Sequence, residues 1–224
     1  MPPRNPSLAA TGGRENRRED RVTTAPERLL QAFRQYLGAL SEPVPSRFLE
    51  GLGEPMQARD LALRTLDCLA HLDRIAASAP PESHGLIRLL ADHRDQLVWG
   101  QTYTAADFGQ HFIDNYGWLE LIGTRGHFES EEIAAGFLIL GPGVHYPDHH
   151  HAAEEIYVPL AGEAEWRKGN GSFLRWQPGE VIHHPSNVSH AMRTGSEPLL
   201  ALYLWRGGPL AQRSVIAPAE TEAF

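Results

Sequence analysis

The sequence predicts a mainly β protein, a small antiparallel jelly-roll barrel preceded by an α-helical N-terminal region. Apolar residues recur at helical spacing between about residues 26 and 96. From about residue 98 the pattern changes to short apolar runs separated by Gly, Pro, Asn and Asp, which is typical of a sandwich or barrel. A third observation is a group of histidines with a glutamate inside this β region, which indicates a metal site in the barrel.

The composition is that of a globular protein without affinity for polyanions. The chain has 224 residues, enough to bury a full core, and a net charge of −8 from 20 basic and 28 acidic residues. This balance argues against binding nucleic acid or an anionic membrane. No apolar run approaches the ~20 residues that span a bilayer, and no secretory signal is visible. The single cysteine, Cys68, excludes an internal disulfide, so we expect a cytoplasmic protein.

Composition divides the chain into four parts. Residues 1–24 are polar and rich in Pro, Gly, Arg and Thr, so we expect a mobile tail. A helical region follows over residues 25–97 and the barrel over 98–212. Residues 213–224 are expected to form a C-terminal tail.

Three amphipathic helices are expected in the helical region. The first begins at Pro26, a residue suited to a first helical turn, and ends before the proline-rich segment 41–46. The second spans about 56–78 and the third about 82–96. Their apolar stripes need a partner surface, so the helices should pack on the barrel or form a homodimer interface. The stripes consist of Leu29, Leu30, Phe33, Leu37 and Leu40, of Ala62, Leu66, Leu69, Leu72 and Ala76, and of Leu86 and Leu90.

Eight strands are expected in the β region. Residues 168–171, Lys-Gly-Asn-Gly, lie between two of them and predict a hairpin. The eight runs are residues 117–123, 133–140, 155–160, 164–168, 172–176, 180–184, 189–193 and 199–205.

The stretch 143–162 carries the most chemistry. His149, His151 and Glu155 stand at i, i+2 and i+6, and alternate side chains of a strand share one face. Tyr157 keeps the same parity, so its phenol should lie beside these three groups. Two imidazoles and a carboxylate on one face are typical of a site for a divalent metal, with a fourth ligand from elsewhere.

A second stretch, residues 179–190, ends in the histidine that completes the pattern. Together the two stretches resemble the paired motifs of the cupin superfamily. The first motif, G-x5-H-x-H-x3-E-x6-G, is met at every position by residues 143–162. The second, G-x5-P-x-G-x2-H-x3-N, is met by Gly179, Pro185 and His190. The resemblance implies a cupin barrel, and it implies four metal ligands: His149, His151, Glu155 and His190.

Two positions depart from the second cupin motif. Asn187 stands where glycine is usual, and Thr194 stands where asparagine is usual. Asparagine tolerates a positive φ better than other non-glycine residues, so a tight turn at Asn187 is still expected. The ligand set accepts one divalent transition metal ion, Fe, Mn, Co, Ni or Zn, and the sequence does not choose among them.

Two tyrosines extend the resemblance. The arrangement Tyr146-x2-His149-x-His151-x3-Glu155-x-Tyr157, with a histidine beyond it, is similar to the cupin-type dimethylsulfoniopropionate lyases. Among these it is most similar to the bacterial branch called DddL. The likeness implies β-elimination of dimethylsulfoniopropionate to dimethyl sulfide and acrylate. It also implies that Tyr157 is the base and that Tyr146 assists at the site.

The implied chemistry agrees with the residue types. A divalent metal that binds the substrate carboxylate stabilises the negative charge that develops at the α-carbon. The same cation lowers the pKa of a nearby tyrosine from its ordinary value of ~10, which favours the phenolate that acts as a base. Tyr146 has the opposite parity to His149, so Pro147 would have to bend the strand for Tyr146 to join the site. The sulfonium group needs aromatic faces, because it is a cation without hydrogen-bond donors. The aromatic candidates in the β region are Trp118, Trp166, Trp176, Tyr203 and Trp205.

The remaining histidines have weaker support. His145 shares the parity of His149 and is the reserve ligand. His150 is expected outside the ligand set, and either His183 or His184 could lie just behind the ligands, although structural roles are favoured. No motif supports His111 or His127.

Two other functions remain open. One is a different metal-dependent cupin enzyme such as a dioxygenase, which needs no tyrosine base and stops without oxygen. The other is a non-catalytic cupin that binds a small ligand, although no helix-turn-helix or basic stripe of a sensor is evident.

Overall fold

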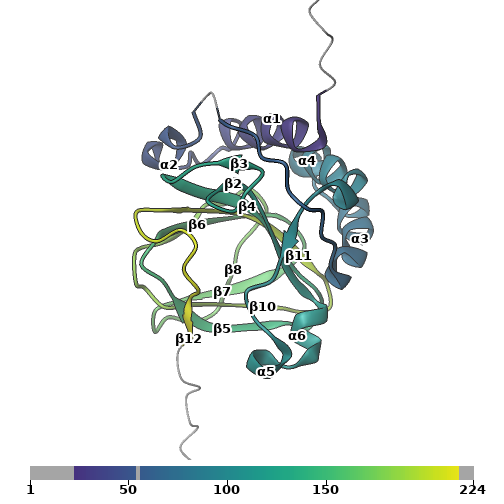
Figure 1. Cartoon of the computed structure of the whole chain (residues 1–224). Coiled ribbons are helices and arrows are strands. Elements are labelled where there is room, and N and C mark those ends of the chain that lie inside the picture. Colours follow the sequence, from purple (N-terminus) through teal and green to yellow (C-terminus); the bar gives the residue numbers. More distant parts are fainter. Residues whose placement is uncertain (1–22, 54–55, 217–224) are drawn as a thin grey trace, which may run out of the picture.

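Two β-sheets face each other as a barrel, and helices cover the outer side of one sheet (Figure 1). This computed structural model describes residues 23–53 and 56–216. The expected tail over 1–24 therefore lies almost wholly outside the described residues, as do residues 217–224 of the expected C-terminal tail. The predicted fold class, a mainly β barrel with an N-terminal α-helical region, is confirmed.

The larger sheet has seven strands in the order β1-β2-β4-β11-β6-β9, and β3 pairs with β2. All eight residues of β4 are buried, because one face of this sheet lines the barrel and the other meets the helices. Five of its strands, β2, β4, β6, β9 and β11, were predicted within a few residues. The bounds are Trp99–Gly100 for β1, Tyr116–Gly123 for β2, Phe128–Glu129 for β3, Ile133–Leu140 for β4, Glu154–Ala161 for β6, Ile182–His184 for β9 and Leu199–Arg206 for β11.

The smaller sheet has the order β12-β5-β10-β7-β8. The predicted hairpin at residues 168–171 is confirmed, because β7 and β8 pair antiparallel on either side of it. β12 extends the sheet into the stretch expected as a tail and pairs with β5. The bounds are His145–His150 for β5, Ala164–Lys168 for β7, Leu174–Arg175 for β8, His190–Thr194 for β10 and Val215–Ile216 for β12.

The first predicted helix is confirmed as α1 (Ala25–Gly38). A capping box fixes its start: the backbone N–H of Thr24 donates to Oε2 of Glu27 over 2.8 Å, and the backbone N–H of Glu27 donates to Oγ1 of Thr24 over 3.4 Å. The third predicted helix is α4 (Pro81–Asp92), followed by the 3₁₀ turn η2 (Arg94–Gln96). The short helices α2 (Ser46–Glu50), α5 (Ala105–Phe108) and α6 (Gln110–Asp114) were not predicted.

The second predicted helix, over 56–78, is wrong in its first half. Only the 3₁₀ turn η1 (Asp67–His71) and α3 (Leu72–Ala77) are helical. The preceding segment bonds to the barrel instead: the backbone N–H of Arg59 donates to the carbonyl of His127 over 2.8 Å, and the N–H of Glu129 donates to the carbonyl of Gln57 over 2.9 Å. Backbone groups used in this way cannot form helical hydrogen bonds.

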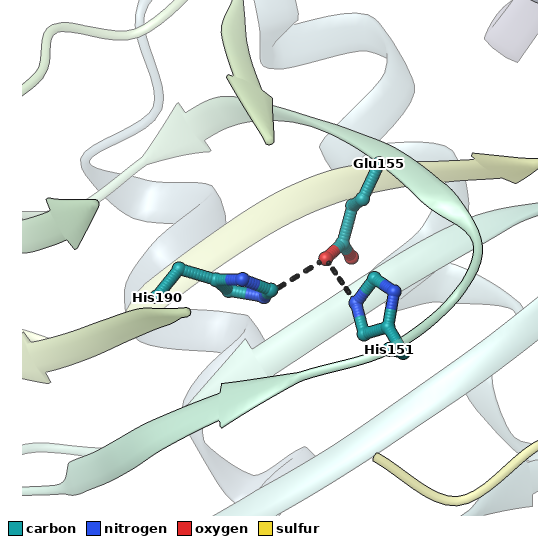
Figure 2. A group of neighbouring side chains, drawn as sticks. All are labelled: His151, Glu155 and His190. Carbon is teal, nitrogen blue, oxygen red and sulfur yellow. Dashed lines mark hydrogen bonds and ion pairs between the residues drawn. The ribbon is translucent and has the colours of Figure 1, made fainter. Parts of the chain in front are cut away.

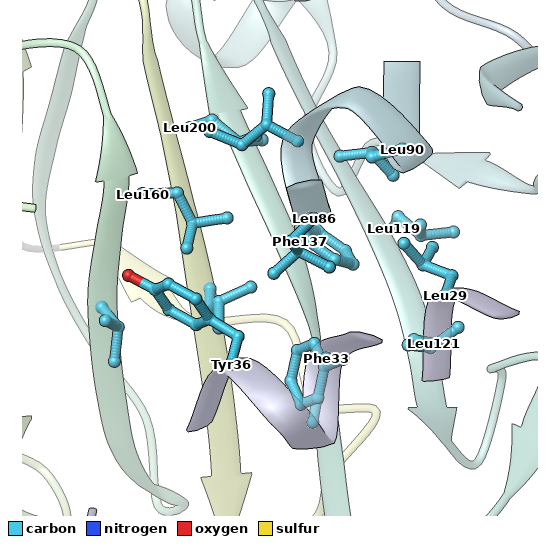
Figure 3. Packing of buried hydrophobic residues seen from close by; sticks show 14 of the residues in the cluster. Leu29, Phe33, Tyr36, Leu86, Leu90, Leu119, Leu121, Phe137, Leu160 and Leu200 are labelled. Carbon is cyan, nitrogen blue, oxygen red and sulfur yellow. The ribbon is translucent and has the colours of Figure 1, made fainter. Parts of the chain in front are cut away.

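The main core lies between the helices and the larger sheet (Figure 3). Phe33 of α1 meets Phe137 of β4 edge-on, with ring centroids 5.7 Å apart. Leu86 and Leu90 of α4 enter the same core. This packing explains the apolar residues on β6 whose parity is opposite to that of the predicted ligands. They face the helices, while the ligands face the barrel interior.

Candidate metal centre and active site

Three side chains of the kinds that bind metals converge inside the barrel (Figure 2). Oε2 of Glu155 lies 2.9 Å from Nε2 of His151 and 3.1 Å from Nε2 of His190. The ligand atoms of the three residues lie within 4.8 Å of one another, and all three residues are buried. The structure thus brings together three of the four residues expected as metal ligands.

Both sheets contribute to this group. Glu155 lies on β6 of the larger sheet, and His190 begins β10 of the smaller one, directly opposite His149 of β5. The backbone N–H of Asn187 donates to the carbonyl of His151 over 2.8 Å, which joins the second motif to the first. Asn187 has a φ of 61°, so the expected tight turn without glycine is confirmed.

Thr194 stands where the motif usually has asparagine, and its hydroxyl both donates and accepts hydrogen bonds. Its hydroxyl donates to the carbonyl of Gly141 over 2.7 Å and accepts from the backbone N–H of Val144 over 2.9 Å. These bonds hold the loop that leads into β5. Thr194 therefore stabilises the approach to the site although it departs from the motif.

All three candidate histidine ligands are held in one tautomer. Nδ1 donates to a backbone carbonyl in each: to Pro147 from His149 over 2.9 Å, to Ala153 from His151 over 2.8 Å and to Val188 from His190 over 3.0 Å. A carbonyl only accepts, so each Nδ1 carries the proton, and a neutral ring then presents the lone pair of Nε2. Proteins orient histidine ligands of metals by this type of bond.

Burial and mutual charge set the protonation of the group. Burial opposes the charge of Glu155, but His151 and His190 outweigh it and hold the pKa of Glu155 well below its ordinary value. Burial also opposes the charge of His151, yet the carboxylate beside it raises the pKa of that imidazole. Burial and His190 lower the pKa of His149 well below its usual value. An anionic carboxylate beside imidazoles suits a divalent cation, which binds these rings in their neutral form.

A bulge in β5 turns both Tyr146 and His149 inward. The register opposite β10 shifts between His190 and Met192, so β5 has one extra residue there, next to Pro147. The expected bend at Pro147 is thus confirmed. The ring of His149 stacks on that of Tyr146 at 4.1 Å and 8°, and its centroid lies 4.1 Å from that of His190. His149 therefore borders the three-residue group without belonging to it.

Both candidate tyrosines line one cavity with Glu155. The cavity is lined by Thr102, Tyr116, Trp118, Arg125, Ala134, Leu138, Tyr146, Glu155, Tyr157, Tyr203, Trp205, Leu210, Gln212 and Ser214. Burial, and after it the charge of Glu155, raises the pKa of Tyr157 well above its ordinary value. Burial likewise raises the pKa of Tyr146. Either phenol needs a neighbouring positive charge before it ionises near neutral pH.

Three of the five aromatic candidates for the sulfonium group border this cavity: Trp118, Tyr203 and Trp205. Trp166 and Trp176 are not among its lining residues. Trp205 already contacts two of the candidate ligands. Its Nε1 donates to Oε1 of Glu155 over 2.5 Å, and its ring stacks on that of His151 at 3.9 Å.

The other histidines occupy varied positions. The prediction of His145 as a reserve ligand is wrong. The bulge leaves this side chain exposed, with the centroid of its ring 6.2 Å from that of Phe173. His183 donates to Glu154 over 2.7 Å, away from the site. His184 does lie behind the ligands, stacked on His190 at 4.2 Å and 19°.

Sequence reasoning missed one residue that lines the cavity, Arg125, and one that contacts a lining residue, Tyr103. Arg125 is held on Trp118, 4.7 Å from the ring, and its Nη2 donates to the buried carboxylate of Glu120 over 2.8 Å. Tyr103 lies 2.9 Å from Tyr146, oxygen to oxygen. Neither belongs to a motif, and Tyr103 precedes the first predicted strand, so only the fold reveals them.

The chain matches the family model described as dimethylsulfoniopropionate lyase over residues 41–201. The relatives that it matches include the dimethylsulfoniopropionate lyase DddQ of Ruegeria pomeroyi, 43% identical over 109 residues, which cover 49% of this chain and 54% of the relative. A putative dimethylsulfoniopropionate lyase DddL of Cereibacter sphaeroides is 30% identical over 125 residues, 55% of this chain and 51% of the relative. The chain thus spans about half the length of these curated relatives.

A solved structure extends the comparison to nearly the whole fold. The crystal structure of the lyase DddQ from Ruegeria pomeroyi aligns with a TM-score of 0.77 and 29% identity, covering 88% of this chain and 98% of that one. The alignment therefore includes helices as well as the barrel.

Proposed function

The chain belongs to the dimethylsulfoniopropionate lyase family, and from this premise we propose that it cleaves dimethylsulfoniopropionate to dimethyl sulfide and acrylate. The observation that supports this most directly is the cavity in which Tyr146 and Tyr157 lie beside Glu155. Glu155 in turn contacts His151 and His190. A candidate base therefore lies next to a candidate metal site.

His149, His151, Glu155 and His190 would hold one divalent transition metal ion. The shared tautomer of the histidines and the buried carboxylate between two of them fit such an ion. When bound, the ion would supply Lewis-acid stabilisation of the substrate carboxylate and of charge at the α-carbon. Fe, Mn, Co, Ni and Zn all suit this donor set.

Tyr157 is the proposed base. Its phenolate oxygen takes the α-proton, the C–H electron pair forms the new C=C bond, and the C–S bond breaks with its electrons leaving on dimethyl sulfide. The products are acrylate and a protonated Tyr157, which must lose its proton before the next cycle. Positioned bases of this kind typically contribute ~10²–10⁴-fold to the rate.

The cavity also has surfaces for the two ends of the substrate. The faces of Tyr203 and of the neighbouring Trp118 suit a sulfonium, although Arg125 occupies one face of Trp118. Tyr146, stacked on His149, is placed to orient the substrate beside the ligands. Tyr146 and Tyr203 are buried, which limits contact of bulk water with this part of the cavity.

Cellular location and assembly remain predictions. No helix in the described part of the chain is both long and apolar enough to cross a membrane. We propose that the enzyme acts in the cytoplasm on a small molecule, without nucleic acid or membrane partners. A homodimer stays a prediction from the apolar helices.

Headspace detection of dimethyl sulfide tests the proposal. Metal-loaded protein incubated with dimethylsulfoniopropionate should release dimethyl sulfide and acrylate in equal amounts, with and without oxygen. Chelator-treated protein should release neither, and added metal should restore both. Turnover that stops under nitrogen would favour a dioxygenase instead.

A further inference from the structure

The hydroxyl of Tyr146 has a dedicated partner outside the sequence motifs. Its oxygen lies 2.9 Å from that of Tyr103, and both tyrosines are buried. We propose that Tyr103 is a positioning residue that fixes the hydroxyl of Tyr146 in the active site. This inference rests on the proposed function of the site, in which Tyr146 assists turnover.

Rings on several sides restrict Tyr146. The centroids of Phe112 and Tyr116 lie 5.6 Å and 5.7 Å from that of Tyr146, and the centroid of Phe108 lies 6.4 Å away. Phe108 and Phe112 come from α5 and α6, so these two short helices shape one end of the barrel. The rings limit tilting of the phenol, but the edges of Phe108 and Phe112 do not orient its O–H, and a buried hydroxyl needs a polar partner. Tyr103 provides one over 2.9 Å. The hydroxyl of Tyr116 also lies near Tyr146, but it donates to Thr102 over 3.4 Å.

One face of the Tyr146 ring packs on His149, a candidate metal ligand. Its ring stacks on His149 at 4.1 Å and 8°, while Nδ1 of His149 donates to Pro147. Tyr146 is therefore held at its hydroxyl by Tyr103 and on its ring face by His149. Loss of the first contact should leave the phenol close to its place but free to reorient its oxygen.

Tyr103 is held in turn by residues just before β12. The guanidinium of Arg213 lies 5.0 Å from the centroid of the Tyr103 ring and donates to Oδ1 of Asp107 in α5 over 2.6 Å. Ser214 follows Arg213 and lines the cavity near Tyr103. β12, which pairs with β5 beside His149, begins one residue later. Tyr103 therefore has a fixed position before substrate enters.

A double-mutant cycle tests the proposal on full-length, metal-loaded protein. Tyr103→Phe should lower kcat about tenfold to a hundredfold, the size of effect that a misplacement of about 1 Å produces. KM, metal content and melting temperature should stay close to those of the parent protein. Tyr103→Phe with Tyr146→Phe should be no slower than Tyr146→Phe alone, because Tyr103 acts through Tyr146. Tyr36→Phe, which alters a buried tyrosine in the helix–sheet core, is the matched control and should keep full activity.

Two kinetic results would overturn the proposal: unchanged kcat in Tyr103→Phe, or losses that multiply in the double variant. A crystal structure of Tyr103→Phe gives a readout that does not depend on activity. It should show the Tyr146 oxygen displaced or disordered, and an unmoved, ordered oxygen would refute the positioning role even if the chain released no dimethyl sulfide. Absence of dimethyl sulfide from the parent protein would count against the proposed function alone.

Discussion

Trp205 holds Glu155 from the neighbouring strand. The two residues pair directly across β11 and β6, and Nε1 of the indole donates to Oε1 of the carboxylate over 2.5 Å. The same indole stacks on His151 at 3.9 Å. One side chain thus orients two candidate ligands, so Trp205 would support the candidate metal centre in addition to lining the cavity.

Trp205→Phe should weaken metal binding about tenfold to a hundredfold, because it retains an aromatic ring against His151 but loses the bond to Glu155. Titration of the chelator-treated protein with Zn²⁺ or Co²⁺ measures this change. Trp166→Phe is the control, since Trp166 is buried and its Nε1 has no hydrogen-bond partner among the described residues. Equal affinities in the two variants would show that the Trp205–Glu155 bond does not support the site.

His151→Ala and His190→Ala should each lower bound metal and abolish turnover while leaving a folded barrel. Each change removes one imidazole from the group around Glu155. His149→Ala tests whether the bordering histidine is also a ligand and should give the same result. Elemental analysis measures metal per chain, and circular dichroism checks the fold. Full metal occupancy in both the His151 and the His190 variant would contradict the assignment of these residues as metal ligands.

A chain shortened to begin near residue 98 should aggregate or lose most activity. Without the helices, the outer face of the larger sheet would expose residues that are now fully buried, among them Phe137, Ile156 and Val158. Exposed apolar surface of this kind promotes association. Size-exclusion chromatography and the headspace assay check the result. A monodisperse, fully active short chain would show that the helices are dispensable.

Glu154→Gln should destabilise the protein by about 1 kcal/mol at pH 7, an estimate reduced for exposure to solvent. Nε of Arg47 in α2 donates to Oε2 of Glu154 over 3.2 Å, and such bonds, opposed by burial, lower the pKa of Glu154 from 4.5 to about 2. A carboxyl whose folded pKa is depressed stabilises fully above its unfolded pKa and loses that contribution as the pH falls through the folded value.

The difference in stability between parent and Glu154→Gln should therefore shrink between about pH 4.5 and pH 2. Denaturant unfolding across this range measures it. Glu163→Gln, which breaks an exposed pair with Arg175, serves as control and should have little effect at any pH. A constant difference down to pH 2 would contradict the assigned charge interaction.

The sequence predicted those parts of the fold and site that follow local periodicity. Strand parity correctly placed Glu155 and Tyr157 on one face of β6, and the turn at Asn187 was anticipated from its tolerance of positive φ. His151 instead follows β5 in the other sheet, so it meets Glu155 because the barrel brings the two sheets together and not through alternation along one strand. Parity failed for His145, because the bulge in β5 inserts a residue that no alternation rule includes.

Long-range bonding explains the remaining errors. Residues 57–59 were expected at the start of the second helix, but their backbone bonds to the barrel at His127 and Glu129. Tyr103 contacts Tyr146 across 43 residues of sequence. Contacts that depend on tertiary folding leave no spacing signal in a single sequence.

The central claim is that Tyr157 removes the α-proton beside a bound metal. The most direct test is the rate of dimethyl sulfide release by metal-loaded Tyr157→Phe, which deletes one oxygen and leaves the four candidate ligands in place. Turnover should fall by two or more decades while metal content stays at the parent level, as expected for loss of a positioned base. Near-normal release with metal bound would contradict the claim and leave Tyr146 as the leading candidate for the base.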